Sequence, residues 1–221
     1  MAGRGNVPHA TDGQGLDRAA SPCARLTEVR LAYRTRTDGR IAVTIDSNVW
    51  DLFHRLDLRL STELPKNRFL LFIPREIEIE IVAIPARPDK EALKTYIARE
   101  MADSAIDVTA VFGFARQDGG PQRYGGFGFG AFQSEDARGF YAAIREPYLL
   151  NRSARKSGLT SNEGDTAVAA ASFSSVVLTL DMKPGPLRAA LDHGGKVLDM
   201  TPFERSGLSL ADYIVRYHEE G

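Results

Sequence analysis

Three aspartates stand where apolar runs end or where a helical run begins. Asp46 ends the apolar run 40–46, Asp181 ends the run 174–181, and Asp165 opens the Ala-rich run 166–173. Carboxylates that are packed together repel one another and raise each other's pKa, so a protein that gathers several of them normally supplies a cation. Mg²⁺ and Mn²⁺ prefer oxygen ligands and stabilise the charge that develops on a phosphodiester oxygen. If the fold brings these residues together, their chemistry indicates metal-assisted phosphodiester hydrolysis.

The elements that must position these acids alternate between strand and helix. Apolar runs predict strands over 40–46, 68–73, 174–181 and 195–200. Four-residue apolar spacing and capping residues predict helices over 49–60, 90–112, 134–144, 166–173, 187–191 and 209–218. Such alternation predicts a three-layer α/β/α fold with a central, mostly parallel sheet. In such a sheet the strands that precede Asp46 and Asp181 end at one edge, and a helix that packs antiparallel on the last of them returns Asp165 to that edge.

A fourth acid comes from residues 75–84, whose pattern has two interpretations. Pro74 precedes the segment and suits the first turn of a helix, but the alternation from Glu76 to Ile81 also fits a strand. We expect the helix. On one face of it Glu76 and Glu80 are four residues apart, so either of them is a candidate for the acidic cluster.

Composition limits the classes of protein to which the chain can belong. It has 221 residues, of which 43% are hydrophobic and 26% charged, and its 28 Lys and Arg nearly cancel its 29 Asp and Glu. With this balance the chain has no overall positive charge, so any binding of nucleic acid must depend on a local group of basic residues. The single cysteine, Cys23, excludes a disulfide framework and a cysteine-rich zinc site. Because we find neither a membrane-spanning run nor a secretory signal, we expect a cytoplasmic protein without a membrane partner.

We expect one folded domain over residues 26–221. Residues 1–25 contain few large apolar side chains and predict a disordered tail. Residues 113–132 predict a Gly/Phe-rich insertion, in which Phe127, Phe129 or Phe132 either stack on bases or simply pack.

Four short motifs together resemble the PIN-domain ribonuclease family. In chain order they are Ile45-Asp46-Ser47-Asn48-Val49-Trp50, Ile73-Pro74 followed by Glu80-Ile81, Asp165-Thr-Ala-Val-Ala-Ala-Ala171, and Leu178-Thr179-Leu180-Asp181. The resemblance covers residues 41–200. It implies a PIN-like nuclease domain that binds Mg²⁺ or Mn²⁺ and cleaves RNA, with Asp46, Glu80, Asp165 and Asp181 as its catalytic and metal-binding residues. It favours Glu80 as the second acid, although Glu76 can still take that role.

Several polar residues near the acids are candidates for substrate binding. Asn48 and Thr179 are placed to orient Asp46 or a substrate, and the cations Arg155, Lys156 and Lys183, together with Arg152, suit phosphate groups. Besides RNA as a partner, the resemblance leaves open a homodimer and an antitoxin-like inhibitor protein.

Two other functions compete with a nuclease. A degenerate PIN-like module would bind RNA or a protein without catalysis. A phosphatase that attacks with the Asp after its first strand would need a second Asp two residues later, where this chain has Asn48.

Overall fold

A parallel sheet forms the centre of the protein. The computed structural model describes residues 31–111, 121–124, 130–131, 137–141, 144, 148 and 156–220. In these residues six strands follow the order β4-β3-β2-β1-β5-β6, and every neighbouring pair is parallel. The strands are β1 (Ile41–Ile45), β2 (Phe69–Pro74), β3 (Asp107–Val111), β4 (Gly130–Ala131), β5 (Val176–Thr179) and β6 (Val197–Asp199).

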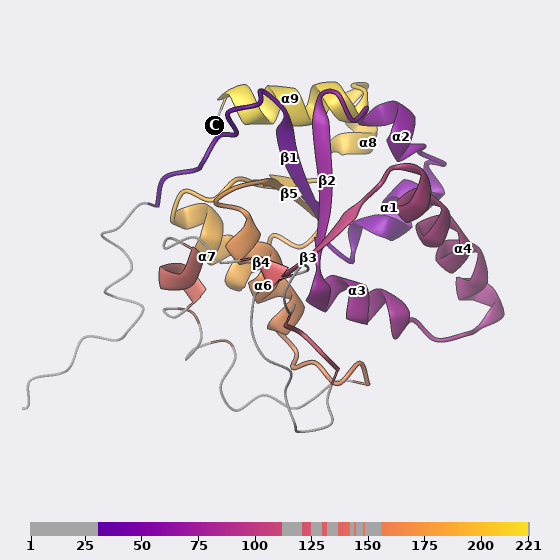
Figure 1. The fold of residues 1–221 in the computed structure, drawn as a ribbon. Helices are drawn as coiled ribbons and strands as arrows, with labels where there is room; N and C mark the ends of the chain where they lie inside the picture. The colour runs from indigo at the N-terminus through magenta and orange to yellow at the C-terminus, as the bar shows by residue number, and fades with distance from the viewer. Residues whose placement is uncertain are drawn as a thin grey trace, which may run out of the picture.

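Helices cover both faces of the sheet, which gives the predicted three-layer α/β/α fold. Figure 1 shows α1 and α4 on one side of the sheet and α6 and α7 on the other. The helices are α1 (Val49–Arg55), α2 (Leu60–Glu63), α3 (Arg75–Val82), α4 (Pro88–Asp103), α6 (Glu163–Ala171), α7 (Pro186–Asp192), α8 (Phe203–Ser206) and α9 (Leu210–Glu220). The strands β1 and β5 are buried on both faces, as their apolar runs predict.

The order of the strands places the ends of β1 and β5 side by side. Ile45 pairs with Leu178 in the register of these two strands. The backbone N–H of Asp46 donates to the carbonyl of Leu178 at 3.1 Å, so the ladder continues to the residue that follows β1. Asp46 therefore lies opposite Thr179 at the carboxyl edge of the sheet.

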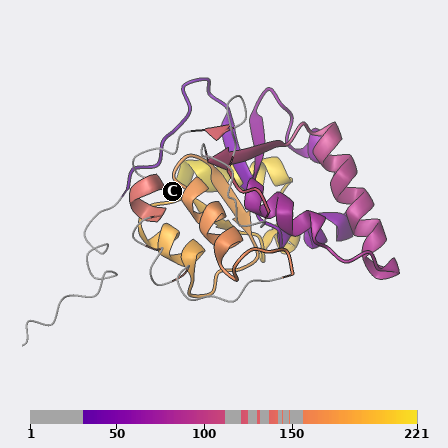
Figure 2. The ribbon, with the colours of Figure 1, turned by 60° about the horizontal axis from the view of Figure 1, so that its bottom comes forward.

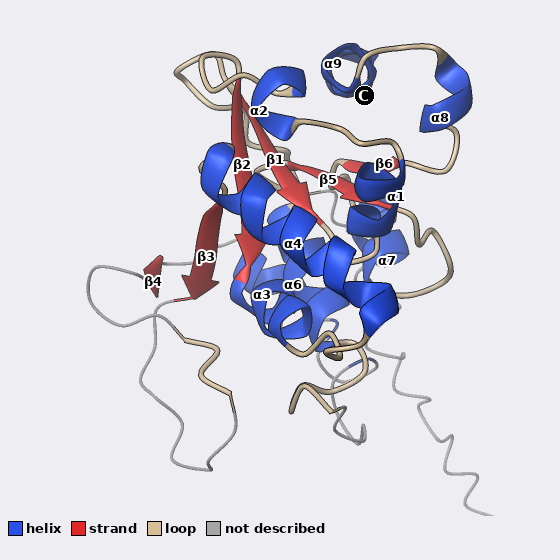
Figure 3. Ribbon diagram, turned by 90° about the vertical axis from the view of Figure 1, so that its right-hand side faces the viewer, coloured by secondary structure: helices blue, strands red, loops and turns tan. Residues whose placement is uncertain are grey.

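Helices α3 and α6 contact each other at this same edge. Figure 2, which turns the bottom of Figure 1 toward the viewer, shows the two helices side by side, and Figure 3 shows them again below the carboxyl ends of β1 and β2. Helix α6 also contacts β1, β2 and β5. The helix predicted over residues 75–84 is confirmed as α3, and the alternative strand is not formed.

Two predicted helices differ from the structure. The helix expected over 49–60 is divided into α1 and α2, because Asp57 adopts a positive φ of 48° between them. The helix expected over 90–112 ends with α4 at Asp103, since Ala105 also has a positive φ of 48°. The residues that follow form the strand β3, which the sequence pattern did not predict.

Other segments agree with the patterns that predicted them. The runs around residues 166–173, 174–181, 187–191 and 195–200 form α6, β5, α7 and β6. The terminal helix α9 starts after Ser209, whose hydroxyl accepts from the backbone N–H of Asp212 at 3.1 Å and donates to its carboxylate at 2.7 Å. This is the helix start that the spacing predicted.

Parts of the expectations fall on residues outside those described. They include the tail 1–25, most of the insertion 113–132 with its three phenylalanines, and part of the helix expected over 134–144. In the described part of the chain, no helix combines the length and the apolar character needed to cross a bilayer.

Candidate active site

Asp46 is the centre of a polar network at the carboxyl edge of the sheet. Its side chain is buried, with 1% of its surface exposed. The Oδ1 atom accepts from the backbone N–H of Ser47 at 2.7 Å. The Oδ2 atom accepts from the Nδ2 group of Asn48 and from the hydroxyl of Thr179, both at 2.7 Å. Two of these three donors thus come from the residues that directly follow Asp46 between β1 and α1.

Burial raises the pKa of Asp46 to about 6, and the neighbouring carboxylates add to this shift. The hydrogen bond from Thr179 opposes the effect of burial, whereas the negative charges of Asp165 and Glu80 raise the pKa further. Two of the predicted acids are therefore close enough to Asp46 for their charges to act on it. This is the pattern that a group of converging carboxylates produces.

Glu80 and Asp165 are brought together by the contact between α3 and α6. A Cβ atom added to Gly164, the residue before Asp165, would lie 3.0 Å from Oε1 and 3.2 Å from Cδ of Glu80. The carboxyl group of Glu80 thus rests against the backbone of α6 next to Asp165. A side chain at position 164 would press on this carboxyl group, which would have to shift by a few tenths of an ångström.

Asp181 is joined to Asp46 through Thr179 and not by a direct hydrogen bond. Its backbone N–H donates to the hydroxyl oxygen of Thr179 at 3.0 Å, while that hydroxyl donates to Asp46. The carboxylate of Asp181 is exposed and accepts from the backbone N–H of Lys183 at 3.0 Å. Asp181 is therefore at the solvent side of the network.

Glu76, the other candidate for the second acid, faces a different set of charges. Burial raises its pKa to about 7, Glu163 adds to the shift, and Arg123 opposes it. Glu163 forms an ion pair with Arg123, and 11% of its side-chain surface is exposed. Glu80, and not Glu76, is thus the residue of α3 whose charge acts on Asp46.

The predicted substrate-binding residues divide into two groups. Asn48 and Thr179 belong to the network, and the Oδ1 atom of Asn48 also accepts from the backbone N–H of Leu180 at 2.9 Å. Lys183 is exposed two residues after Asp181, and Lys156 is exposed in the turn before α6. Arg155 and Arg152 lie outside the described residues.

The donor set suits a hard divalent cation. It consists of carboxylate oxygens, one of them on Asp46, whose pKa is raised by burial and further by its acidic neighbours. Among the described residues, no group of three or more His, Cys, Asp or Glu side chains is arranged to hold a metal ion as the side chains stand.

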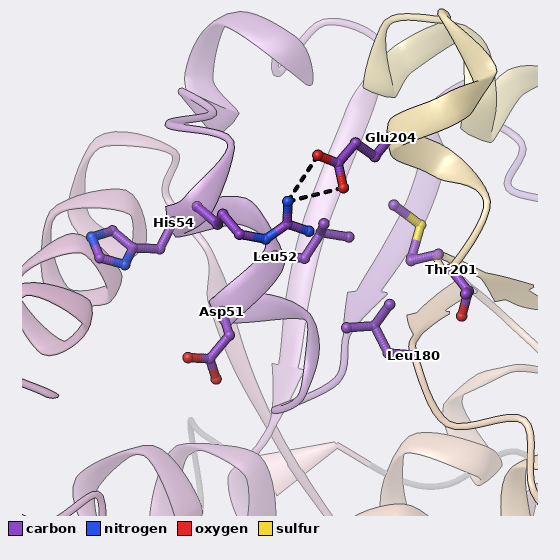
Figure 4. Close-up of a pocket in the computed structure, with 8 residues that line it drawn as sticks. Asp51, Leu52, His54, Leu180, Thr201 and Glu204 are labelled. Carbon is purple, nitrogen blue, oxygen red and sulfur yellow. Dashed lines mark hydrogen bonds and ion pairs between the residues drawn. The ribbon is translucent and has the colours of Figure 1, made fainter. Parts of the chain in front are cut away.

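A pocket of about 490 Å³ lies between α1 and α8. Figure 4 shows Leu52, Leu180 and Thr201 around it, and Met200 also lines it. Two further lining residues, Arg55 and Glu204, form an ion pair at 2.8 Å. Its lining includes Leu180, the residue between Thr179 and Asp181, and none of the four candidate acids.

Sequence reasoning missed two features of this site. One is Gly164, for which an isolated glycine at the start of an Ala-rich helix was a usable signal, since such a glycine often has a packing reason. The other is the buried ion pair of Glu163 with Arg123, which are 40 residues apart. Comparison of the chain with protein-family models and with curated proteins gives no match in either case.

Proposed function

We propose that the protein is a metal-dependent endoribonuclease, in which Asp46, Glu80, Asp165 and Asp181 hold Mg²⁺ or Mn²⁺. The observation that carries this proposal is the buried carboxylate of Asp46, whose pKa is raised by burial and by the charges of Asp165 and Glu80. A structural Asp at a strand end needs one or two hydrogen bonds, but it does not need two further acids next to it. Binding of a cation offsets that repulsion.

Each part of the network has a role in this proposal. The hydrogen bonds from Thr179 and Asn48 fix the orientation of the Asp46 carboxylate. In this proposal, the lone pairs that these bonds do not use bind the cation. Asp181 supplies an exposed carboxylate on the side from which a substrate arrives. When bound, a divalent cation would lower the pKa of a coordinated water and neutralise charge on the phosphodiester oxygens.

The reaction is hydrolysis of a phosphodiester bond. The oxygen of a water molecule forms a bond to phosphorus, the bond from phosphorus to one bridging oxygen breaks, and that oxygen takes up a proton. The products are a phosphomonoester and a hydroxyl group. RNA as the substrate rests on the PIN-like motifs. Lys183 and Lys156, which are both exposed, offer positive charge for its phosphates.

The test is cleavage of a labelled single-stranded RNA in Mn²⁺, in Mg²⁺ and in EDTA, with DNA of the same sequence in parallel. We expect cleavage of RNA in either metal and none in EDTA or with Asp46→Asn. Asp51→Asn is the matched control, because Asp51 is an exposed Asp of α1 that pairs with Lys90 at 3.1 Å. This control should cleave like wild type.

The products separate this reaction from its alternatives. Attack by water leaves no 2′,3′-cyclic phosphate, whereas a contaminating nuclease that uses the 2′-hydroxyl produces one and remains active in EDTA. RNA binding without cleavage in either metal would contradict the proposal and assign the chain to the non-catalytic, PIN-like binding modules.

A further inference from the structure

Residues 121–124 reach across from the insertion to both helices that carry acids. Pro121 packs against Gly158 in the turn before α6. The carbonyl of Gln122 accepts from the Nε group of Arg75, the first residue of α3, at 3.1 Å. Arg123 donates to the carbonyl of Gly158 at 2.9 Å and to Oε2 of Glu163, the first residue of α6, at 3.3 Å.

The ion pair between Arg123 and Glu163 is the buried part of this connection. Each side chain is 11% exposed. The Oε2 atom of Glu163 also accepts from the backbone N–H of Thr160 at 2.9 Å, which fixes the turn that enters α6. A buried charge whose partner is removed is strongly destabilising. The start of α6 therefore depends on a residue of the insertion.

Arg123 also acts on α3. Its charge opposes that of Glu163 at Glu76, which is one helical turn before Glu80. Without this cation, the charge of Glu163 on α6 would act on the partly buried Glu76 of α3 with less opposition. The repulsion would push α3 and α6 apart one helical turn from Glu80 and two residues from Asp165.

We propose that residues 121–124 form a clasp in which Arg123 is a positioning residue for the acidic cluster. By pairing with Glu163, Arg123 holds α3 and α6 at the spacing that lets Glu80 and Asp165 serve one cation. The inference deepens the function proposed above and rests on it. Arg123 itself touches neither the substrate nor the metal.

The direction in which Arg123→Gln changes the affinity for Mn²⁺ distinguishes a positioning role from a purely electrostatic one. Arg123 is a cation near a site for a cation, so by charge alone Arg123→Gln would tighten Mn²⁺ binding. If Arg123 positions the acids, Arg123→Gln weakens Mn²⁺ binding by about 10- to 100-fold, the usual effect of removing a residue that orients metal ligands. Arg123→Lys keeps the charge and should retain part of the affinity.

A double variant tests the cause. Arg123→Gln with Glu163→Gln replaces the ion pair by two amides that can bond to each other, so it should recover most of the wild-type affinity for Mn²⁺. A loss caused only by missing contacts would not be rescued in this way. Arg188→Gln, which breaks an exposed ion pair with Asp192 on α7, is the control and should bind Mn²⁺ like wild type.

Hydrogen exchange of the metal-free protein gives a readout that does not depend on the proposed function. In EDTA, Arg123→Gln should exchange the amides of α3 and of the first turns of α6 at least about tenfold faster, while those of α9 stay unchanged. If wild type binds no Mn²⁺ but this change occurs, the proposed function fails and the clasp stands. Unchanged exchange, or Mn²⁺ binding by Arg123→Gln that equals or exceeds wild type, would overturn the clasp.

Discussion

Thr179 donates its hydroxyl proton to the Oδ2 atom of Asp46 at 2.7 Å, across the ends of two neighbouring parallel strands. The same hydroxyl oxygen accepts from Asn48 at 3.2 Å and from the backbone N–H of Asp181 at 3.0 Å. One buried hydroxyl thus connects the first acid of the cluster to the last. It also lowers the pKa of Asp46 against the effect of burial.

Thr179→Val should therefore weaken both the fold and the proposed metal site. The change keeps the shape of the side chain but leaves Asp46 and the amide of Asn48 with one partner fewer. We expect the free energy of unfolding in EDTA to fall by about 1 to 3 kcal/mol, the cost of leaving buried polar groups without a partner. Urea denaturation with and without Mn²⁺ measures this loss.

The control for Thr179→Val is Thr44→Val. Thr44 lies two residues before Asp46 and shares a buried hydrogen bond of 2.6 Å with Ser175. Both variants should lose stability, but only Thr179→Val should also lose part of the stabilisation that Mn²⁺ gives. An equal response to Mn²⁺ in the two variants would mean that Thr179 has no special relation to the metal site.

The raised pKa of Asp46 predicts how stability depends on pH in metal-free protein. This pKa is about 6 in the folded chain, against an ordinary value of 3.8. Between these two values the folded chain binds more protons than the unfolded one, so the free energy of unfolding falls as the pH rises. Ionisation of Asp46 should lower it by an amount on the order of 2 to 3 kcal/mol once the pH exceeds the folded pKa.

Comparison with Asp46→Asn isolates this effect from other titrating groups. In EDTA, the free energy of unfolding of wild type minus that of Asp46→Asn should fall by that amount between pH 4 and pH 7. The variant is then more stable, relative to wild type, at pH 7 than at pH 4. Thr44→Val changes no titratable group and is the control, so its difference from wild type should not vary with pH. A difference for Asp46→Asn that is the same at both pH values would contradict the environment described for this carboxyl group.

The sequence allowed much of the fold to be predicted, because its strongest signals come from buried elements. The strands β1 and β5 are apolar runs, and their ends identify the positions of Asp46 and Asp181. The strand β3 was missed since it follows a helical pattern directly and two of its residues, Asp107 and Thr109, are exposed. The division of residues 49–60 depends on the backbone of Asp57, which periodicity does not register.

The site was harder to predict where it depends on tertiary contacts. Glu76 and Glu80 share one face of a helix, so their spacing cannot decide which of them meets Asp46. The packing of α3 on α6 decides it, through the space that Gly164 leaves. Arg123 comes from a distant insertion, and local patterns do not indicate its partner.

The two glutamates of α3 should respond differently to substitution. Glu80→Gln removes a charge that acts on Asp46, so it should abolish most of the Mn²⁺-induced rise in melting temperature. That rise corresponds to about 2.7 kcal/mol at a hundredfold excess of metal over its dissociation constant. Glu76→Gln should retain the rise. Thermal melts in EDTA and in Mn²⁺ measure both, and the reverse order would assign the second acid to Glu76.

Gly164→Ala tests the contact between α6 and Glu80 more finely. Alanine favours the helix by up to about 1 kcal/mol, so the fold should not lose stability. The new methyl group would press on the carboxyl group of Glu80 and should weaken Mn²⁺ binding several-fold. Gly139→Ala is the control, since it has open space around it. Equal Mn²⁺ affinities for the two variants would mean that Glu80 is not part of the proposed metal site.

In the proposed function, Asp46 and Asp165 bind the same cation. Titration of the protein with Mn²⁺, followed by the electron paramagnetic resonance signal of the free ion, measures whether they do. We predict saturable binding by wild type and by Asp51→Asn, and a loss of affinity of at least about tenfold for both Asp46→Asn and Asp165→Asn. Binding by these two variants that equals that of wild type would contradict the account, because the acids would then be structural residues and not metal ligands.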